Sequence, residues 1–415
     1  MKLEKFSFGI GDRFAHQGEA QLKAIIKAKE VGIDIVPVWN KSNREHQIIH
    51  SSPVDTRNEA DAAVRRLQWT DPYYVDADHI NLKTVDAFID HSNFFTLDVA
   101  DYIGSEVSET EVNDFLSLAA PYEGKLLIPG IPDPFIVTST ELEVIAKNFL
   151  GAVREAAAIY NHIVSKKGAD NFIAEVSMDE VENPQTPVEL FFILLMIKQY
   201  GIPAQTIAPK FTGRFNKGVD YVGDVEQFRK EFEQDLLVID HAVKTFDLPD
   251  NLKLSVHSGS DKFTIYPIMG ELINKYDKGI HVKTAGTTWL EEVIGLAIAG
   301  EEALQLARTI YARAHERQEE LCGPYATVID IDPATLPTPA EVNQWDGEKF
   351  ANTLRHIPGH PEYHAGFRQL IHVGYKVAAE MGNDFLSMLR QHSGVVGEQV
   401  MTNIYDRHIR RLFGI

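Results

Sequence analysis

Two short strings in the sequence combine histidine with carboxylates. The string DADH occupies positions 76–79 and the string HSGSDK occupies positions 257–262, and each follows an apolar, strand-like run. A carboxylate beside a histidine supplies a proton-transfer group next to a metal ligand. Glycine and serine between a histidine and a helix start can hold an anion with backbone N–H groups. Each string also has a plainer interpretation, a helix cap for the first and an ordinary turn for the second.

Glu175 is the third residue that points to chemistry, because it lies inside the apolar run FIAEVSM. Its carboxylate is expected to face a protein interior, where an unpaired carboxyl group would become neutral. A metal ion or a lysine avoids this, and Lys210 and Lys283 are the candidate lysine partners. Two histidines and one carboxylate are a common ligand set for Zn²⁺, Mn²⁺ or Fe²⁺ at a site with open positions.

Other reactive side chains follow the remaining strand-like runs. In a parallel barrel, catalytic and binding residues gather at the carboxyl ends of the strands. The residues at these ends that we predict to bind substrate are Asn40, Lys41, Lys210, Arg214, Ser258, Asp261 and Lys283. Ordinary polar loops would explain any one of these residues, but not their presence at so many successive strand ends, because an unpaired buried charge is costly.

The elements that must position these residues alternate along the chain. Short apolar or β-branched runs, each followed by a longer amphipathic segment, predict strands at 5–10, 33–38, 73–78, 94–99, 172–177, 204–210, 252–257 and 280–283. Eight strands with eight following helices, the last at 287–299, predict a (β/α)₈ barrel, although an open doubly wound sheet gives the same alternation.

The predicted organisation has two parts. Residues 1–300 form the catalytic barrel, with a proline-rich insertion or small hairpin at about 121–138. Residues 301–415 form a helical extension that packs on the barrel and has no core of its own. Within this extension, histidines at 356, 360, 364 and 372 flank prolines and a glycine that break a helix. A lid or surface loop is the favoured interpretation, and a contribution to the active site is the alternative.

Composition excludes several classes of protein. The net charge of −20 is a poor match for nucleic acid or an anionic membrane surface. No run approaches the roughly 20 apolar residues that a membrane-spanning helix needs. The single cysteine, Cys322, excludes an internal disulfide and sites with several cysteines. Without a signal peptide at the N-terminus, the chain is expected in the cytoplasm.

Five strings together resemble a known family. FGIGDRF, PVWNKSNREH, VDADHI, FFTLDVADYIG and HSGSDKF are similar to the bacterial tagaturonate/fructuronate epimerases of hexuronate breakdown, over residues 8 to about 382. The resemblance implies interconversion of D-tagaturonate and D-fructuronate, or of a closely related keto-sugar acid.

The order of VDADHI and VHSGS also resembles the metal site of class II aldolases. Carried over by position, Asp78 becomes the acid/base and His79 and His257 become ligands of one divalent ion. Zn, Mn, Fe, Co and Ni all remain open. A further histidine ligand of the aldolase pattern has no counterpart here. Glu175 is expected in its place, with a second catalytic role if it is not a ligand.

The two sugar acids differ at a hydroxylated carbon β to the ketone, and the C–H bond there is not acidic. Retro-aldol cleavage, rotation of the aldehyde and re-addition would invert this carbon, with Lys210, Lys283 or Arg214 holding the carboxylate. The competing functions are a class II aldolase or ketose isomerase on a small sugar, and a non-catalytic sugar-acid-binding protein.

Overall fold

The chain folds around a closed parallel barrel, which confirms the predicted fold class. A computed structural model describes residues 1–258, 261–284 and 286–415. In these ranges the barrel has the strand order β1-β10-β9-β8-β7-β4-β3-β2. Its strands are β1 (Phe6–Gly11), β2 (Ile35–Ser42), β3 (Tyr74–Ile80), β4 (Phe94–Asp98), β7 (Ile173–Ser177), β8 (Thr206–Ala208), β9 (Lys253–His257) and β10 (Ile280–Thr284).

Strand β1 closes the barrel by pairing on both sides, with Phe6 opposite Ile280 of β10 and opposite Ile35 of β2. Because side chains alternate along a strand, every second residue faces the barrel axis. Near the amino ends of the strands many inward positions are apolar, and the buried polar pair Ser7 and His281 lies beside them. A small buried cluster fills this end of the barrel: Leu3, Val36, Val38, Tyr74, Phe94 and Ile173. Towards the carboxyl ends they become polar, so the strands carry their chemistry at one end of the barrel.

Seven of the helices around this barrel lie between β1 and β10 in the chain. They are α1 (Gly18–Glu30), α2 (Asn43–Ile49), α3 (Pro53–Arg66), α5 (Ser139–Lys167), α6 (Pro187–Gln199), α7 (Val225–Phe246) and α8 (Tyr266–Lys275). Local sequence explains several starts: Thr138 and Thr186 both accept a backbone N–H in complete capping boxes, and Asp224 caps α7. The segment after β3 forms only a 3₁₀ turn, at Val85–Ala87.

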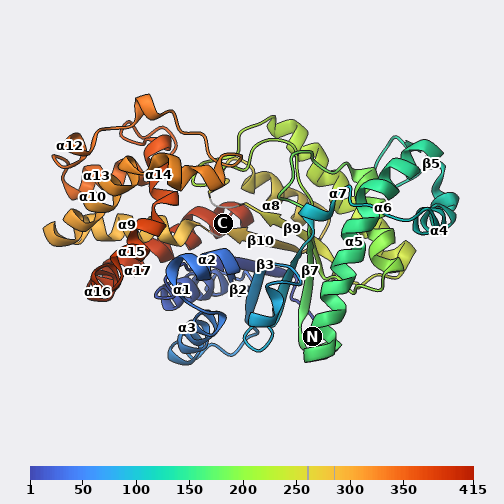
Figure 1. The fold of residues 1–415 in the computed structure, drawn as a ribbon, viewed down its shortest axis with the longest axis horizontal. Coiled ribbons are helices and arrows are strands. Elements are labelled where there is room, and N and C mark those ends of the chain that lie inside the picture. The colour runs from blue at the N-terminus through green and yellow to red at the C-terminus, as the bar shows by residue number, and fades with distance from the viewer. Residues whose placement is uncertain (259–260, 285) are drawn as a thin grey trace.

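The predicted insertion is a small hairpin. Strands β5 (Gly124–Leu126) and β6 (Phe135–Val137) pair antiparallel, with Gly124 opposite Val137. The hairpin follows α4 (Glu109–Ala119), and both lie on the side of the molecule away from the C-terminal helices (Figure 1). This part of the chain is therefore an insertion into the barrel between β4 and β7.

The C-terminal helices surround a hydrophobic core of their own, so the predicted absence of such a core is wrong. They are α9 (Thr287–Ile298), α10 (Glu301–Glu316), α11 (Gln318–Cys322), α12 (Pro339–Val342), α13 (Gly347–Leu354), α14 (Ala365–Val373), α15 (Tyr375–Met381), α16 (Asn383–Gln391) and α17 (Ser393–Thr402). Trp289 and Val293 of α9 pack in this second core with Tyr311, Phe350 and Phe367. We call this group of helices the C-terminal subdomain.

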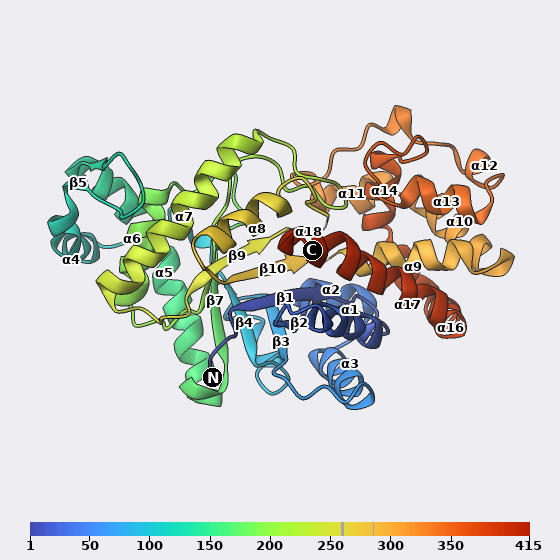
Figure 2. The ribbon, with the colours of Figure 1, turned by 180° about the vertical axis from the view of Figure 1, so that it is seen from behind.

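Helix α9 was expected to be the eighth barrel helix, but it belongs to the C-terminal subdomain instead. The position beside β1 and β10 is occupied by a π-helical segment, Asn403–Ile409, and by α18 (Arg410–Phe413). Ile404, Ile409 and Leu412 are part of the barrel core. Figure 2 shows α18 beside β10 and next to α8. The chain thus leaves the barrel after β10, builds the subdomain and returns to complete the ring of helices.

No helix in the described ranges combines the length and apolar character that a membrane crossing needs.

The contact between α8 and α18 gives a test of this arrangement. A Cβ atom added at Gly270 would lie 1.8 Å from the backbone oxygen of Leu412, whereas one added at Gly394 of α17 meets nothing within 4 Å. We expect Gly270→Ala to lower the free energy of unfolding by about 1–3 kcal/mol through overpacking. Gly394→Ala, the matched control, should raise it by about 0.4–1 kcal/mol. Urea unfolding measures both, and a Gly270→Ala variant as stable as the wild type would contradict the packing described.

Candidate functional site

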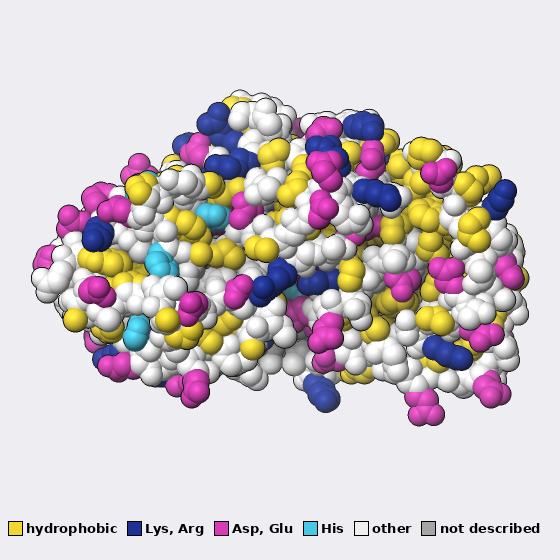
Figure 3. Space-filling model, turned by 90° about the horizontal axis from the view of Figure 1, so that it is seen from above, with side chains coloured by type: hydrophobic (Ala, Val, Ile, Leu, Met, Phe, Trp, Pro, Cys, Tyr) yellow, Lys and Arg dark blue, Asp and Glu magenta, His cyan; other side chains and the backbone are white. Residues whose placement is uncertain are grey.

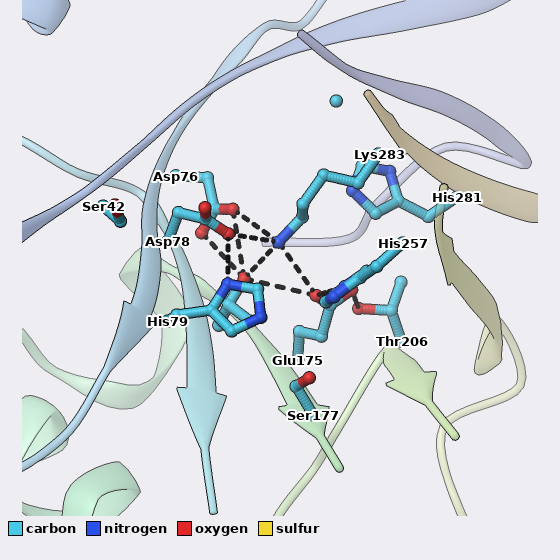
Figure 4. A network of polar contacts seen from close by, with 12 residues as sticks. Ser42, Asp76, Asp78, His79, Glu175, Ser177, Thr206, His257, His281 and Lys283 are labelled. Atoms are coloured by element: carbon cyan, nitrogen blue, oxygen red, sulfur yellow. Dashed lines mark hydrogen bonds and ion pairs between the residues drawn. The ribbon is translucent and has the colours of Figure 1, made fainter. Parts of the chain in front are cut away.

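A lysine and three carboxylates form a buried layer inside the barrel. The Nζ atom of Lys283 lies 2.9 Å from Oδ2 of Asp76, 2.9 Å from Oδ1 of Asp78 and 3.1 Å from Oε1 of Glu175. It also donates to the hydroxyl oxygen of Thr96 over 2.7 Å. The four charged residues are at most 4% exposed. Figure 4 shows them pointing toward one another from β3, β7 and β10.

Two of these carboxylates each hold a histidine ring. Oδ1 of Asp78 lies 2.8 Å from Nδ1 of His79, and Oε1 of Glu175 lies 2.8 Å from Nε2 of His257. Because an ionised carboxylate can only accept hydrogen bonds, each of these ring nitrogens must carry the proton. Although burial lowers them, Asp78 and Asp179 raise the pKa of His79, and Asp179 and Glu175 raise the pKa of His257 to about 9. A bound cation would replace the proton on the other nitrogen of each ring, which is the usual arrangement around a metal-bound histidine.

The two remaining ring nitrogens converge on Asp179. Oδ1 of Asp179 lies 3.4 Å from Nε2 of His79 and 3.1 Å from Nδ1 of His257. Although the second distance is short, Nδ1 of His257 has no partner with hydrogen-bond geometry in the described part of the chain. The three ligand atoms lie within 4.8 Å of one another, and this is the one group of that kind among the described residues. Nε2 of His79 has hydrogen-bond geometry toward Asp179, whereas the direction of Nδ1 of His257 suits a shared cation better.

Local backbone structure sets this convergence. His79 has φ of 51°, a left-handed conformation that is uncommon for residues other than glycine, asparagine and aspartate. The conformation ends the regular alternation of β3, so that the ring of His79 turns toward β9 instead of away from it. Asp179 follows β7, and the hydroxyl of Ser177 donates to its Oδ1 over 2.6 Å. Strain of this kind concentrates at functional sites.

The charges in the layer are mutually stabilised. Burial alone would raise the pKa of Glu175, but the Lys283 ammonium and the His257 ring hold it well below its ordinary value. Burial would also raise the pKa of Asp78, which Lys283 and His79 lower instead. Burial dominates at Asp76 and raises its pKa to about 6, against the pull of Lys283. Asp78 and Glu175 are therefore ionised hydrogen-bond acceptors over the whole physiological range.

Asp98 is a different kind of carboxyl group. It is the last residue of β4, it is only half-buried, and its Oδ1 accepts a hydrogen bond from the backbone N–H of Ala100. Burial raises its pKa, and the charge of nearby His79 opposes this only in part. A carboxyl group with a raised pKa at the mouth of a barrel is suited to proton transfer.

Asn40 and Ser258, two of the predicted substrate-binding residues, lie close to the Lys283 layer. The Asn40 side chain is 2% exposed, and neither atom of its carboxamide has a hydrogen-bond partner in the ranges described. A Cβ atom at Gly9 would meet both Nδ2 of Asn40 and Cγ of Lys283 at 3.0 Å, so these two side chains are neighbours. The hydroxyl of Ser258 donates to the backbone oxygen of Lys283.

Four other predicted residues have contacts elsewhere. Lys41 faces away from the barrel axis and donates to the backbone oxygen of Arg13. Arg214 is exposed and pairs with Asp330 over 3.1 Å. Asp261 is fully buried among Arg368, His356 and His408. These contacts argue against substrate binding by Lys41, Arg214 and Asp261. Lys210 is half-buried, with its Nζ 6.0 Å from the centre of the Phe215 ring.

The anion-binding loop expected between positions 257 and 262 lies partly outside the described residues, because positions 259 and 260 do.

Asp179 is the residue that reasoning from sequence passed over. Glu175 was predicted as the third metal ligand, but the structure places Asp179 beside the two histidines and Glu175 behind one of them. The sequence carried a weak signal, since Asp179 follows the end of β7 by two residues. The turn after the strand decides which of the two acids, four positions apart, lies beside the histidines. The sequence of that turn has no recognisable pattern.

Comparison with known proteins identifies the family. A family model described as tagaturonate epimerase matches residues 1–412. A tagaturonate/fructuronate epimerase from Thermotoga maritima is 28% identical over 426 residues, which cover 98% of this chain and 81% of the relative.

Solved structures have the same fold. The fructuronate-tagaturonate epimerase from Cohnella laeviribosi with one glycerol bound has a TM-score of 0.82 at 23% identity, covering 99% of this chain and 82% of that one. Its native structure has a TM-score of 0.78 at 24% identity, with coverage of 99% and 82%. Since the family model spans nearly all of the sequence, and the barrel and its C-terminal helices recur in these structures, the chain belongs to the tagaturonate epimerase family.

Proposed function

We propose that this chain is a divalent-metal-dependent epimerase that interconverts D-tagaturonate and D-fructuronate. Membership of the family and the names of its relatives support the substrate pair. One observation carries the metal dependence: Nε2 of His79, Nδ1 of His257 and Oδ1 of Asp179 converge within 4.8 Å. Each histidine also has its other nitrogen on a carboxylate, as metal-binding histidines usually do.

Two histidines and one carboxylate fit a first-row divalent cation, and Zn²⁺, Mn²⁺, Fe²⁺, Co²⁺ and Ni²⁺ are all compatible with these donors. Three protein ligands leave coordination positions for substrate oxygens. When bound, such an ion supplies a Lewis acid for the negative charge that develops on a ketone oxygen. Asp78 and Glu175 keep both rings in the ligating tautomer, and Lys283 keeps both carboxylates ionised.

The proposed reaction is a retro-aldol cleavage followed by re-addition. A base takes the proton of the β-hydroxyl group, the bond between the α- and β-carbons breaks, and an enediolate fragment and an aldehyde result. The aldehyde turns, and the bond re-forms on its other face as the proton returns. Asp98 is placed to transfer this proton because it is half-buried at the mouth of the barrel and has a raised pKa.

The earlier assignment of Asp78 and Glu175 as proton-transfer residues stays a prediction. Their contacts favour a positioning role, because Oδ1 of Asp78 and Oε1 of Glu175 each accept from a histidine and from Lys283. A group with a strongly lowered pKa is also a weak base near neutral pH.

The cytoplasmic location of the protein stays a prediction from the sequence.

Product analysis tests the function. Incubated with D-tagaturonate, the protein should form D-fructuronate until equilibrium is reached, without net release of three-carbon fragments. A chelator should abolish turnover because the Lewis acid is lost, and one of the five cations should restore it. Chromatography of the sugar acids measures the conversion. Accumulation of cleavage products would indicate an aldolase, and tight binding without turnover would indicate a binding protein.

Variants of Asp179 and Glu175 test which of the two carboxylates binds the metal and which one only orients a histidine ligand. Asp179→Asn should lose most of its metal because the carboxylate that would bind the ion directly is removed. Glu175→Gln should keep a full set of ligands and weaken metal binding by about 10–100-fold. Titration of the metal-free variants with Zn²⁺, with metal content measured by mass spectrometry, gives both affinities. If Glu175→Gln loses metal while Asp179→Asn retains it, Glu175 is the third ligand.

Asp98→Asn should lower kcat by about 10²–10⁴-fold, because an amide cannot take up the hydroxyl proton, while metal content stays unchanged. Asp101→Asn is the matched control, since Asp101 is a nearby exposed acid after the same strand, and it should leave kcat within a factor of about two. Steady-state kinetics on metal-loaded protein makes the comparison. Full activity of Asp98→Asn, together with loss of activity in metal-loaded Asp78→Asn, would return the catalytic role to Asp78.

A further inference from the structure

His372 of α14 is a buried polar side chain that the proposed chemistry leaves unused. It is 1% exposed, and neither ring nitrogen has a hydrogen-bond partner among residues 1–258, 261–284 and 286–415. Leaving a buried donor and a buried acceptor unsatisfied is unfavourable, and such groups in native proteins usually have a functional explanation. The ring therefore needs a partner that is not part of the described chain.

The ring lies against the mouth of the barrel. A Cβ atom added at Gly286, three residues after Lys283, would lie 2.0 Å from Nε2 of His372. Only glycine leaves room for the ring at this distance. On its other side the ring neighbours Gly218, where an added Cβ would lie 3.6 Å from Cβ of His372. The C-terminal subdomain thus places His372 between the loops that follow β10 and β8.

Positive charge surrounds this position. Burial, reinforced by the charges of Arg13, Lys217, Arg368 and Lys262, holds the pKa of His372 well below its ordinary value. The ring is therefore neutral and carries one N–H donor. Figure 3 shows basic side chains near the middle of the molecule, with acidic side chains beside them. In a chain with a net charge of −20, this local excess of cations suits an anionic ligand.

Three of these four cations already have partners. Arg13 pairs with Glu45 over 3.1 Å and Arg368 pairs with Asp261 over 2.5 Å. The ammonium of Lys262 donates to the backbone oxygens of Asn216 and Val219. Lys217 differs, because no carboxylate of the described chain lies within 4.0 Å of it, and its Nζ lies 5.9 Å from the centre of the Tyr325 ring. It is half-buried and available to a ligand.

From this arrangement we infer that His372 and Lys217 bind the carboxylate of the sugar acid, and this rests on the proposed function. The neutral ring donates a hydrogen bond to one carboxylate oxygen, and Lys217 provides the opposite charge. The C-terminal subdomain then supplies the group that selects a sugar acid over a neutral sugar.

The chemistry of the substrate gives this contact a second role. Cleavage between the α- and β-carbons leaves the carboxylate on the aldehyde fragment, two bonds from the aldehyde carbon. A fragment held by its carboxylate can turn about the bond next to the aldehyde and present its other face without leaving the site. The same contact therefore serves recognition and retention, which is how binding energy away from the reacting atoms supports a reaction.

Lys217→Met tests the inference against the alternative that Lys210, a half-buried lysine in the same loop, binds the carboxylate. Lys230→Met, at an exposed lysine of α7, is the control. Lys217→Met should raise the KM for D-tagaturonate about 10–100-fold, the usual cost of a lost charge-assisted hydrogen bond. The kcat/KM for D-tagatose, which has no carboxylate, should stay within a factor of about two. Lys230→Met should match the wild type, Lys210→Met should change the KM less than Lys217→Met does, and Lys217→Arg should recover most of the affinity.

His372→Leu should raise the same KM and should release the three-carbon aldehyde acid during turnover. Because the ring is buried, Lys217→Met decides the question if His372→Leu does not fold. An unchanged KM in Lys217→Met, or the expected effects in Lys210→Met instead, would overturn the inference.

A calorimetric titration with D-tagaturonate separates the inference from the proposed function. If the wild type binds D-tagaturonate without converting it, and Lys217→Met weakens that binding, epimerisation fails and the carboxylate site stands.

Discussion

The ammonium group of Lys283 balances three carboxylates in a space that water hardly reaches, and the candidate site is built on that balance. Two of the carboxylates, those of Asp78 and Glu175, orient the histidine rings on either side of Asp179. Without the lysine they would be buried, unpaired charges, which proteins avoid by taking up protons. A protonated carboxyl group could donate to the histidines instead of accepting from them. The tautomers of both rings thus depend on one amine, and the excess negative charge of the layer favours a cation at the ligand atoms.

The C-terminal subdomain is an integral part of this barrel. Its core holds α9, which in a regular barrel would cover β10 and β1, and the segment that covers them instead comes after the subdomain. The buried carboxylate of Asp261 adds a polar connection, because it joins the loop after β9 to Arg368 and His356 of the subdomain and to His408 beside the barrel. This anchoring fixes the position of α14, and with it the ring of His372, relative to the strand ends.

Much of the fold could be predicted because it follows local rules. Runs such as IDIVPV and LKLSVH have the β-branched composition of buried parallel strands, and eight strands with helices after them leave few architectures open. The destination of 287–299 could not be predicted in this way. A strongly apolar helix can cover a barrel or fill a second core, and only contacts far apart in the chain decide which. The packing of residues 403–413 against the barrel could not be predicted for the same reason.

The candidate site shows a similar division. His79, His257, Asp78, Glu175 and Lys283 were predicted from residue type and position at strand ends, and the structure brings them together. Asp179 and His372 were not singled out for the roles proposed for them, since a turn decides the first position and helix packing the second. The contact of Lys41 with the backbone of Arg13 has a simple explanation. Lys41 neighbours Asn40 in sequence, and adjacent residues of a strand face opposite sides, so only one of them can point into the barrel.

The position of the segment at 403–413 has a consequence for how the chain acquires its structure. The ring of His408 packs edge-on against Phe8 of the first strand, with ring centres 6.2 Å apart, although 400 positions separate the two residues. At a ribosomal rate of about 5–20 residues per second, roughly 20–80 s pass between their synthesis. During that interval the outer surface of β1 has no covering helix, and an exposed strand surface of this kind is prone to aggregation.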